Sequence, residues 1–277
     1  MKKEPERKAG KDRKASEREA GKDRRKEHYA EGSFLAEKLA DLFYPPRCPL
    51  CAGVLPPLPR LRRECSWQEL VCDSCAKELP WIREPVCKKC GRPLEDDREE
   101  EEYCAQCART ERPYVEGRGV FSYRGALRRS VLQMKYYNRR EWLTFFAAAM
   151  TPHAVDAAVR RGVRTIVPVP CSRKKKRQRG YDQSVLLAKQ LSDRSGIRMC
   201  ADSLIRTRDT RALSGLGMRE RRENLEGAFT VLHAERLEEP VLLTDDIFTT
   251  GSTLEECCAA LGRAGIREIY FLVLCIA

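Results

Sequence analysis

The sequence predicts an α/β protein in which a parallel sheet with flanking helices follows a small double zinc-ribbon domain. Two observations predict this class. Eight of the fourteen cysteines form four Cys-x-x-Cys pairs between residues 48 and 107. From about residue 115 onward, short apolar segments alternate with segments of helical periodicity, which is typical of chains that build parallel sheets.

The first 32 residues differ from the rest of the chain. Basic side chains dominate there, AGKDRK at 9–14 recurs as AGKDRR at 20–25, and apolar side chains are almost absent. Such a segment cannot bury enough surface to fold alone, so we expect a disordered or frayed helical tail. A nucleic-acid-binding arm is the alternative, which the interleaved acidic residues disfavour. The expected organisation is a basic low-complexity tail (1–32), a double zinc ribbon with a leading helix (33–112) and the α/β domain (113–277).

The net charge and the lack of long apolar segments indicate which partners and which cellular location to expect. The formal net charge is +12, from 53 basic and 41 acidic side chains, and it favours contact with phosphates or polyanions. No apolar run approaches the roughly 20 residues that span a bilayer, and the N-terminus lacks the apolar stretch of a signal peptide. We therefore expect a cytoplasmic protein with no integral membrane segment, which reaches a membrane only through partners.

The paired cysteines predict two structural zinc sites. Two residues between thiolates let both sulfurs reach one Zn²⁺ at about 2.3 Å, and two such pairs complete a tetrahedral site without an open position for substrate. Disulfides are the alternative, but no secretory signal accompanies these cysteines. Cys65 is the alternative ligand if the pairing differs, and the remaining cysteines are expected in the core or in loops. Pairing in sequence order gives a first site with Cys48, Cys51, Cys72 and Cys75 and a second with Cys87, Cys90, Cys104 and Cys107.

The α/β half contains predicted strands that are separated by helices. Gly196 and Gly265 end two of these helices. Single-helix connections imply parallel strands, and parallel sheets bind ligands beyond the carboxyl ends of their strands. In order, we predict helices at 123–135 and 142–160, a strand at 164–170, a helix at 184–196, strands at 202–208 and 241–246, a helix at 252–265 and a last strand at 267–277.

The stretch VLLTDDIFTTGST, residues 241–253, is the strongest functional signal. An ordinary helix cap would explain Ser252, but not two carboxylates at the end of a buried strand. Asp245 and Asp246 can accept hydrogen bonds from the vicinal hydroxyls of a ribose. The residues that follow lead into a helix N-terminus, where free N–H groups and hydroxyls can enclose a phosphate. This predicted phosphate loop comprises Thr249, Thr250, Gly251, Ser252 and Thr253.

This stretch resembles the phosphoribosyl pyrophosphate (PRPP) motif of type I phosphoribosyltransferases, and residues 40–277 as a whole resemble the ComF family. The resemblance implies a type I phosphoribosyltransferase-like domain, PRPP bound with Mg²⁺, and a role in uptake of single-stranded DNA during natural transformation (competence). It also implies a DNA-translocating helicase as partner at the cytosolic face of the membrane. Besides the zinc knuckles and 241–253, it rests on Tyr123, Gly125, Leu127, Lys135, Tyr136, the VPVP segment 167–170, Arg179 to Gln183, Thr210, Arg221, Asn224 and Phe229.

The resemblance also implies ligand-binding roles for two further segments. Residues 171–180 match the pyrophosphate loop, and 206–226 match the flexible loop that closes over PRPP. A solvated basic loop or a nucleic-acid patch is the alternative for the first, and an exposed charged helix for the second. The sequence departs from the family at Leu213, where many members have Gln, and at Asp182, where Asn is common. The implied contacts are Arg173, Lys174, Arg177, Arg179 and Gly180 in the first loop and Arg219, Arg221 and Arg222 in the second.

Three functions are compatible with these features. The first is a DNA-uptake component that binds PRPP, with ribbons and basic loops for protein partners or single-stranded DNA. The second is an active phosphoribosyltransferase of nucleotide metabolism, in which Asp245 and Asp246 hold the ribose while Mg²⁺ and basic residues meet the leaving diphosphate. The third is a regulator that binds PRPP or a nucleotide without turnover. The aromatic side chains that stand out for base stacking are few, namely Tyr103, Tyr114, Phe121 and Tyr123.

Overall fold

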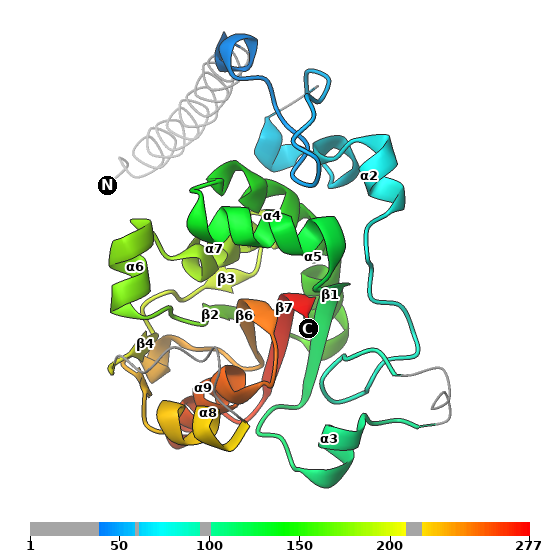
Figure 1. Cartoon of the computed structure of the whole chain (residues 1–277). Coiled ribbons are helices and arrows are strands. Elements are labelled where there is room, and N and C mark those ends of the chain that lie inside the picture. The colour runs from blue at the N-terminus through cyan, green and yellow to red at the C-terminus, as the bar shows by residue number, and fades with distance from the viewer. Residues whose placement is uncertain (1–38, 59–60, 95–100, 209–217) are drawn as a thin grey trace, which may run out of the picture.

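The computed structural model describes residues 39–58, 61–94, 101–208 and 218–277 (Figure 1). The predicted basic tail and two family-motif positions, Thr210 and Leu213, lie outside the described residues. Within the described segments, no helix is both long and apolar enough to cross a membrane.

A five-stranded parallel sheet forms the centre of the second half of the chain, which confirms the predicted fold class. Most residues of the two central strands β6 and β7 are apolar and buried, as in sheets that are covered on both faces. In sheet order, the strands are β1 (Glu116–Ser122), β7 (Ile269–Ile276), β6 (Val241–Phe248), β2 (Thr165–Pro168) and β3 (Arg198–Met199).

Helices cover both faces of the sheet (Figure 1). Because side chains alternate along a strand, Leu242 and Leu272 join one buried core while Leu243 and Val273 join the other. The first core lies under α4 (Gly125–Tyr136), η4 (Arg140–Trp142), α5 (Leu143–Arg161) and α7 (Gln183–Ser195), and the second under α8 (Met218–Leu225) and α9 (Ser252–Arg263).

Strand β1 was not predicted, because two glycines interrupt its apolar pattern. Both glycines are required by packing. A Cβ on Gly117 would lie 2.0 Å from the ring of Phe271, and one on Gly119 would lie 2.5 Å from Ile276. Glycine weakens a strand on its own, but here it lets β7 side chains pack directly over the backbone of β1.

The prediction that 202–208 belongs to the parallel sheet is wrong. Residues Leu204–Arg206 form β4, which pairs antiparallel with β5 (Phe229–Val231) in a separate two-stranded sheet. The two-residue strand β3 occupies the sheet edge instead. The chain then leaves the sheet because Leu204 and Phe229 are buried together in the core beneath α9.

The cysteine-rich segment has little regular structure. Its elements are η1 (Arg62–Glu64), η2 (Gln68–Leu70), α2 (Asp73–Lys77) and α3 (Ala105–Arg109). In Figure 1 it runs beside α4 and α5 and then along β1. Two short elements of the α/β half complete the fold, α6 (Arg173–Arg179) and η5 (Ala234–Arg236).

Candidate functional site

Asp245 and Asp246 lie near the carboxyl end of β6, which continues to Phe248, two residues beyond its predicted end. Asp246 is 5% exposed. Its Oδ1 accepts a hydrogen bond from Lys135 Nζ at 2.8 Å, and its Oδ2 accepts one from Gln183 Nε2 at 3.2 Å. The last turn of α4 and the first residue of α7 therefore meet at this carboxylate.

Asp245 is only half-buried and has a different environment. Its Oδ1 accepts hydrogen bonds from Ser184 Oγ at 3.1 Å and from the backbone N–H of Asp246 at 2.8 Å. Among the described residues, its Oδ2 has no hydrogen-bond partner. The other three oxygens of the aspartate pair all accept hydrogen bonds.

The two carboxylates have opposite pKa shifts. Burial and the adjacent charge of Asp246 raise the pKa of Asp245 to about 7. Burial would also raise the pKa of Asp246, but the ammonium of Lys135 and the hydrogen bonds from Lys135 and Gln183 outweigh it and lower that pKa. Burial opposes the charge of Lys135, yet Asp246 and Asp245 together raise its pKa. The site thus holds one firmly ionised pair and one carboxyl that titrates near neutrality.

The start of α7 orients this cluster. Asp182, which stands where the family commonly has Asn, is the N-cap and accepts hydrogen bonds from the N–H groups of Ser184 at 3.1 Å and Val185 at 3.4 Å. It also accepts one from the N–H of Cys171 at 3.2 Å. The departure from the family pattern therefore preserves a cap, because either side chain offers an oxygen.

The predicted pyrophosphate loop is a helix over most of its length, so the expectation of a loop at 171–180 is wrong. Ser172 caps α6 by accepting from the N–H of Lys175, and Gly180 ends the helix at φ +77°. Arg179 Nη1 donates to Gln183 Oε1 at 2.6 Å and is thereby linked to Asp246. The structure does not bring the other three predicted basic contacts to the aspartates. Arg173, Lys174 and Arg177 are exposed on α6.

The predicted phosphate loop joins β6 to α9. Gly251 has φ +86°, and a Cβ there would lie 2.9 Å from the Phe248 ring, so only glycine fits. Gly251 is also the N-cap of α9, without a side chain to bond the N–H groups of the first turn. Thr250 Oγ1 and Ser252 Oγ lie 3.0 Å apart at the same place. The hydroxyls of Thr250 and Ser252 therefore lie at the N-terminus of α9, a kind of position where proteins bind phosphates.

The flexible-loop prediction is tested only in part. Residues 209–217 lie outside the described residues. Arg219, Arg221 and Arg222 lie in α8, so the backbone around these three arginines is helical rather than a loop.

The eight paired cysteines come together in the two predicted sets. Within each set, all four sulfurs lie within 4.8 Å of one another. Cys51 and Cys72 Sγ are 3.7 Å apart, as are Cys90 and Cys104 Sγ, close to the separation of about 3.8 Å that a tetrahedral site with Zn–S bonds of about 2.3 Å requires. Cys65 belongs to neither set and donates to Leu61 O. All fourteen cysteines are free, so both donor sets fit zinc.

Three residues of the aspartate cluster were not predicted as site residues. Lys135 and Gln183 belong to the segments that carry the family resemblance, but no role followed from that resemblance, and Ser184 gave no signal. Lys135 follows Met134 on the buried side of α4. A lysine next to the apolar face of a helix, in a chain with paired buried aspartates, is the signal that could have identified it.

Comparison with known proteins agrees with this architecture. Residues 39–108 match the double zinc ribbon domain. The chain is 31% identical to competence protein F of Haemophilus influenzae over 72% of this chain and 87% of that protein.

Two further relatives and one solved structure are also similar. The chain is 28% identical to DNA utilization protein YhgH of Escherichia coli (74% of this chain, 89% of that protein) and 24% identical to competence protein ComFC of Bacillus subtilis (74% and 84%). The solved structure of the allosteric regulatory enzyme of purine biosynthesis aligns with a TM-score of 0.32 and 18% identity, over 51% of this chain and 29% of that one. Because competence protein F is matched at 31% identity over most of its length, this chain belongs to the ComF family.

Proposed function

We propose that this protein is a cytosolic ComF-family component of DNA uptake that binds PRPP with Mg²⁺ where β6 ends. The observation that carries the ligand is Asp245 Oδ2, which accepts no hydrogen bond from the described residues, on the strand that leads into the glycine-capped start of α9. The observation that supports the biological role is the naming of the relatives as competence and DNA utilization proteins.

Each part of PRPP has a complementary group in this arrangement. The 5′-phosphate meets the N–H groups and hydroxyls of 249–253, and Asp245 accepts a ribose hydroxyl. Asp246 is engaged by Lys135 and Gln183, so its role is to hold Lys135 in place. Arg179, at the end of α6, is linked to Asp246 through Gln183 and is the basic residue of the predicted pyrophosphate loop that would meet the diphosphate. The chemistry that Mg²⁺ supplies when bound is charge neutralisation on that diphosphate.

Calorimetric titration of PRPP with Mg²⁺ into the zinc-loaded protein tests the ligand. Asp245→Ala should abolish binding because it removes the open carboxylate. Asp193→Ala is the matched control, because this aspartate is exposed on α7 and pairs with the equally exposed Lys189. No binding by the folded wild type, or equal loss in both variants, would contradict the assignment. Release of diphosphate in the presence of candidate acceptors would then separate an active phosphoribosyltransferase from a regulator that binds without turnover.

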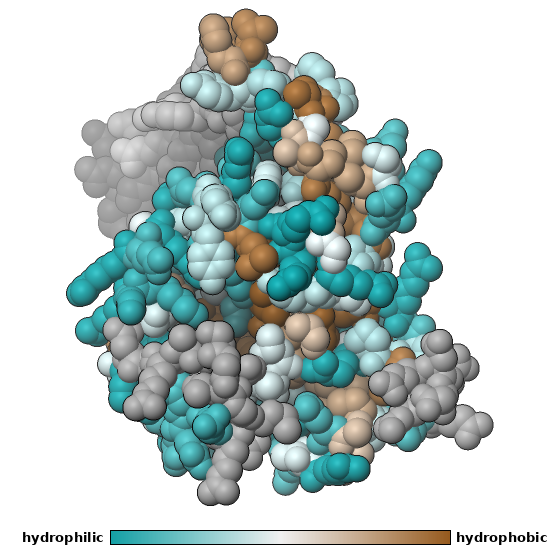
Figure 2. Space-filling view, in the orientation of Figure 1, coloured by the Kyte–Doolittle hydropathy of each residue, from teal (hydrophilic) through white to brown (hydrophobic). Residues whose placement is uncertain are grey.

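A basic surface with aromatic side chains favours single-stranded DNA as the partner. Tyr136 and Tyr137 are 62% and 73% exposed at the end of α4, and the Arg179 guanidinium lies 5.3 Å from the centre of the Tyr136 ring. The neighbouring helix α6 consists almost entirely of exposed cations, and Figure 2 shows hydrophilic side chains around it at the left of the molecule. Aromatic faces beside a cationic track are what single strands bind. Two of the stacking candidates from the sequence, Tyr114 and Phe121, are buried and unavailable.

Fluorescence anisotropy with a labelled oligothymidylate tests this surface. Replacing Tyr136 and Tyr137 by Ala should weaken binding by about 10-fold or more, and the affinity should fall steeply with salt. Tyr44→Ala is the matched control, since Tyr44 is 81% exposed and precedes the first zinc ribbon. If all three tyrosine substitutions leave the affinity unchanged, DNA does not bind here.

A further inference from the structure

Each zinc ribbon begins with a zinc knuckle, the tight turn that carries its first Cys-x-x-Cys pair. The two knuckles, at 48–53 and 87–92, have the same backbone hydrogen bonds. The N–H of Cys48 donates to Gly53 O, and the N–H of Cys87 donates to Arg92 O, each at 2.8 Å. Bridges between Arg47 and Val54 and between Val86 and Pro93 flank the two turns in the same way. Arg92 therefore occupies the position that Gly53 has in the first ribbon. Since the first knuckle forms without a side chain there, the turn itself does not require the guanidinium.

The guanidinium of Arg92 reaches the ligand end of the sheet. Its Nη2 donates to the carbonyl of Thr249 at 2.7 Å, and its Nη1 donates to the carbonyl of Ala277 at 2.6 Å. It also lies 5.8 Å from the centre of the Phe248 ring. A single half-buried side chain from the second ribbon thus joins the ends of β6 and β7 at the first residue of the phosphate loop.

The second ribbon is held against the same elements by its backbone and by a buried ion pair. Lys89 O accepts from the N–H of Gly117 in β1 at 2.8 Å. Gly91, at φ +68°, approaches β1 so closely that a Cβ would lie 2.5 Å from Gly117 O. Arg112, which follows α3, forms an ion pair with Glu255 in the first turn of α9, and the two side chains are only 7% and 12% exposed.

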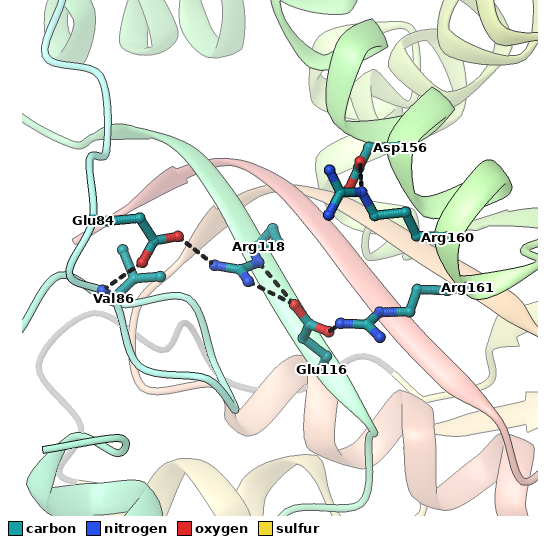
Figure 3. Close-up of polar contacts among 7 residues, drawn as sticks. All are labelled: Glu84, Val86, Glu116, Arg118, Asp156, Arg160 and Arg161. Carbon is teal, nitrogen blue, oxygen red and sulfur yellow. Dashed lines mark hydrogen bonds and ion pairs between the residues drawn. The ribbon is translucent and has the colours of Figure 1, made fainter.

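The approach to the knuckle is anchored at the opposite end of the sheet (Figure 3). Arg118 of β1 bonds Glu84 at 3.3 Å and Glu116 at 2.8 Å. Glu116 also accepts from Arg161 at the end of α5 at 2.7 Å. The segments before and after Cys87 therefore both contact the sheet. These contacts hold the backbone of Arg92 in place, so its guanidinium donates from a fixed position.

We propose that Arg92 is a positioning residue through which the second zinc ribbon sets the conformation of the phosphate loop. A peptide unit is planar, so holding the carbonyl of Thr249 toward Arg92 directs the N–H of Thr250 away from the ribbon. The charged donor also polarises that peptide and strengthens its N–H as a donor. The structural metal centre thereby contributes to anion binding without contacting the anion. The identity of the anion rests on the function proposed above, whereas the positioning does not.

Hydrogen exchange of the ligand-free protein tests the positioning by itself. Arg92→Ala, with two zinc ions per chain verified by elemental analysis, should raise the exchange rate of the Glu255 amide, which donates to Gly251 O at 2.8 Å, by about 10-fold, the effect of losing the charge-assisted hydrogen bond to Thr249. The exchange rate in Arg92→Lys should lie between those of the wild type and Arg92→Ala, because an ammonium cannot donate to both carbonyls in the fork geometry of a guanidinium. Arg47→Ala is the matched control, since the Arg47 guanidinium bonds the carbonyl of Ala52 in its own knuckle, and it should leave the same exchange rates unchanged.

Titration of PRPP with Mg²⁺ into the same variants tests whether Arg92 affects ligand binding. Arg92→Ala should weaken binding by about 10-fold at unchanged zinc content, while Arg47→Ala binds as the wild type does. Wild-type exchange rates and wild-type affinity in Arg92→Ala would overturn the inference. If the wild type binds no PRPP, the proposed function fails, and the exchange rates alone then decide whether Arg92 holds the loop.

Discussion

At the scale of single residues, the ion pair between Lys135 and Asp246 is the most consequential contact of the site. Both side chains are largely buried, at 14% and 7% exposed. Removing one partner of a buried pair leaves the other charge uncompensated, so Lys135→Met should lower the free energy of unfolding by about 3 kcal/mol at pH 7. Urea denaturation measures this value. Lys189→Met is the control, because Lys189 and Asp193 are 61% and 59% exposed and their pair should contribute under about 0.5 kcal/mol. Equal losses in both variants would contradict the importance of the buried pair.

The raised pKa of Asp245 predicts a dependence of stability on pH. The folded protein holds this proton up to a pKa of about 7, whereas the unfolded chain releases it near 3.8. Between these values the folded state binds more protons, so the Asp245 contribution destabilises the protein progressively as pH rises and is constant above about pH 7. Asp245→Asn removes this contribution, and its melting temperature should exceed that of the wild type by more at pH 8 than at pH 5. Parallel pH profiles of the two proteins would show that the Asp245 pKa is not raised.

At the scale of elements, the turn from β6 into α9 depends on glycine at one position and not at another. Gly251→Ala places a Cβ 2.9 Å from the Phe248 ring at φ +86°, and should cost about 1–3 kcal/mol. Gly262 lies in the last turn of the same helix with open space around it, and Gly262→Ala should stabilise by about 0.5 kcal/mol. Urea midpoints of the two variants, compared with the wild type, should therefore move in opposite directions.

The zinc ribbons offer a second comparison between like residues. Cys48 belongs to the first tetrad, and Cys65 is a buried cysteine outside it. Elemental analysis should find one zinc ion per chain in Cys48→Ser and two in Cys65→Ser, because only the first substitution removes a ligand. Loss of zinc from Cys65→Ser would mean that Cys65 is a ligand in the metal-bound protein.

The elements also show which features sequence patterns predict. Apolar runs and paired cysteines depend on local composition, so β6, β7, α9 and the two tetrads were predicted within a few residues of their observed bounds. Strand β1 was missed because Gly117 is required by the ring of Phe271, which lies more than 150 positions away. The same holds for the site. One short segment predicts the role of Asp245 and Asp246. Lys135 and Arg92 instead contact residues that are 111 and 157 positions away in the sequence, and no local pattern predicts such contacts.

At the scale of the whole molecule, the ribbons and the sheet share their cores. Leu55, Leu58 and Leu70 of the first ribbon belong to the same buried cluster as α5, and Cys87 and Leu94 of the second belong to the cluster beneath α9. The boundary near residue 112 remains a prediction from composition. Because each ribbon completes one of the two faces of the sheet, we expect the ribbons and the sheet to unfold as one unit rather than as independent domains.

Two spectroscopic probes can test this cooperativity. In a Trp142→Phe variant, fluorescence reports only Trp67 and Trp81, whose rings lie 4.9 Å apart in the first ribbon. Circular dichroism at 222 nm reports mainly the helices of the α/β half. The two urea transitions should coincide in the zinc-loaded protein, and chelation of zinc should shift both to lower urea together. The Trp81 ring lies 4.4 Å from that of Phe121 in β1, so ribbon and sheet cannot separate without losing this contact. A fluorescence transition that precedes the circular dichroism transition would instead establish the ribbons as an independently folding domain.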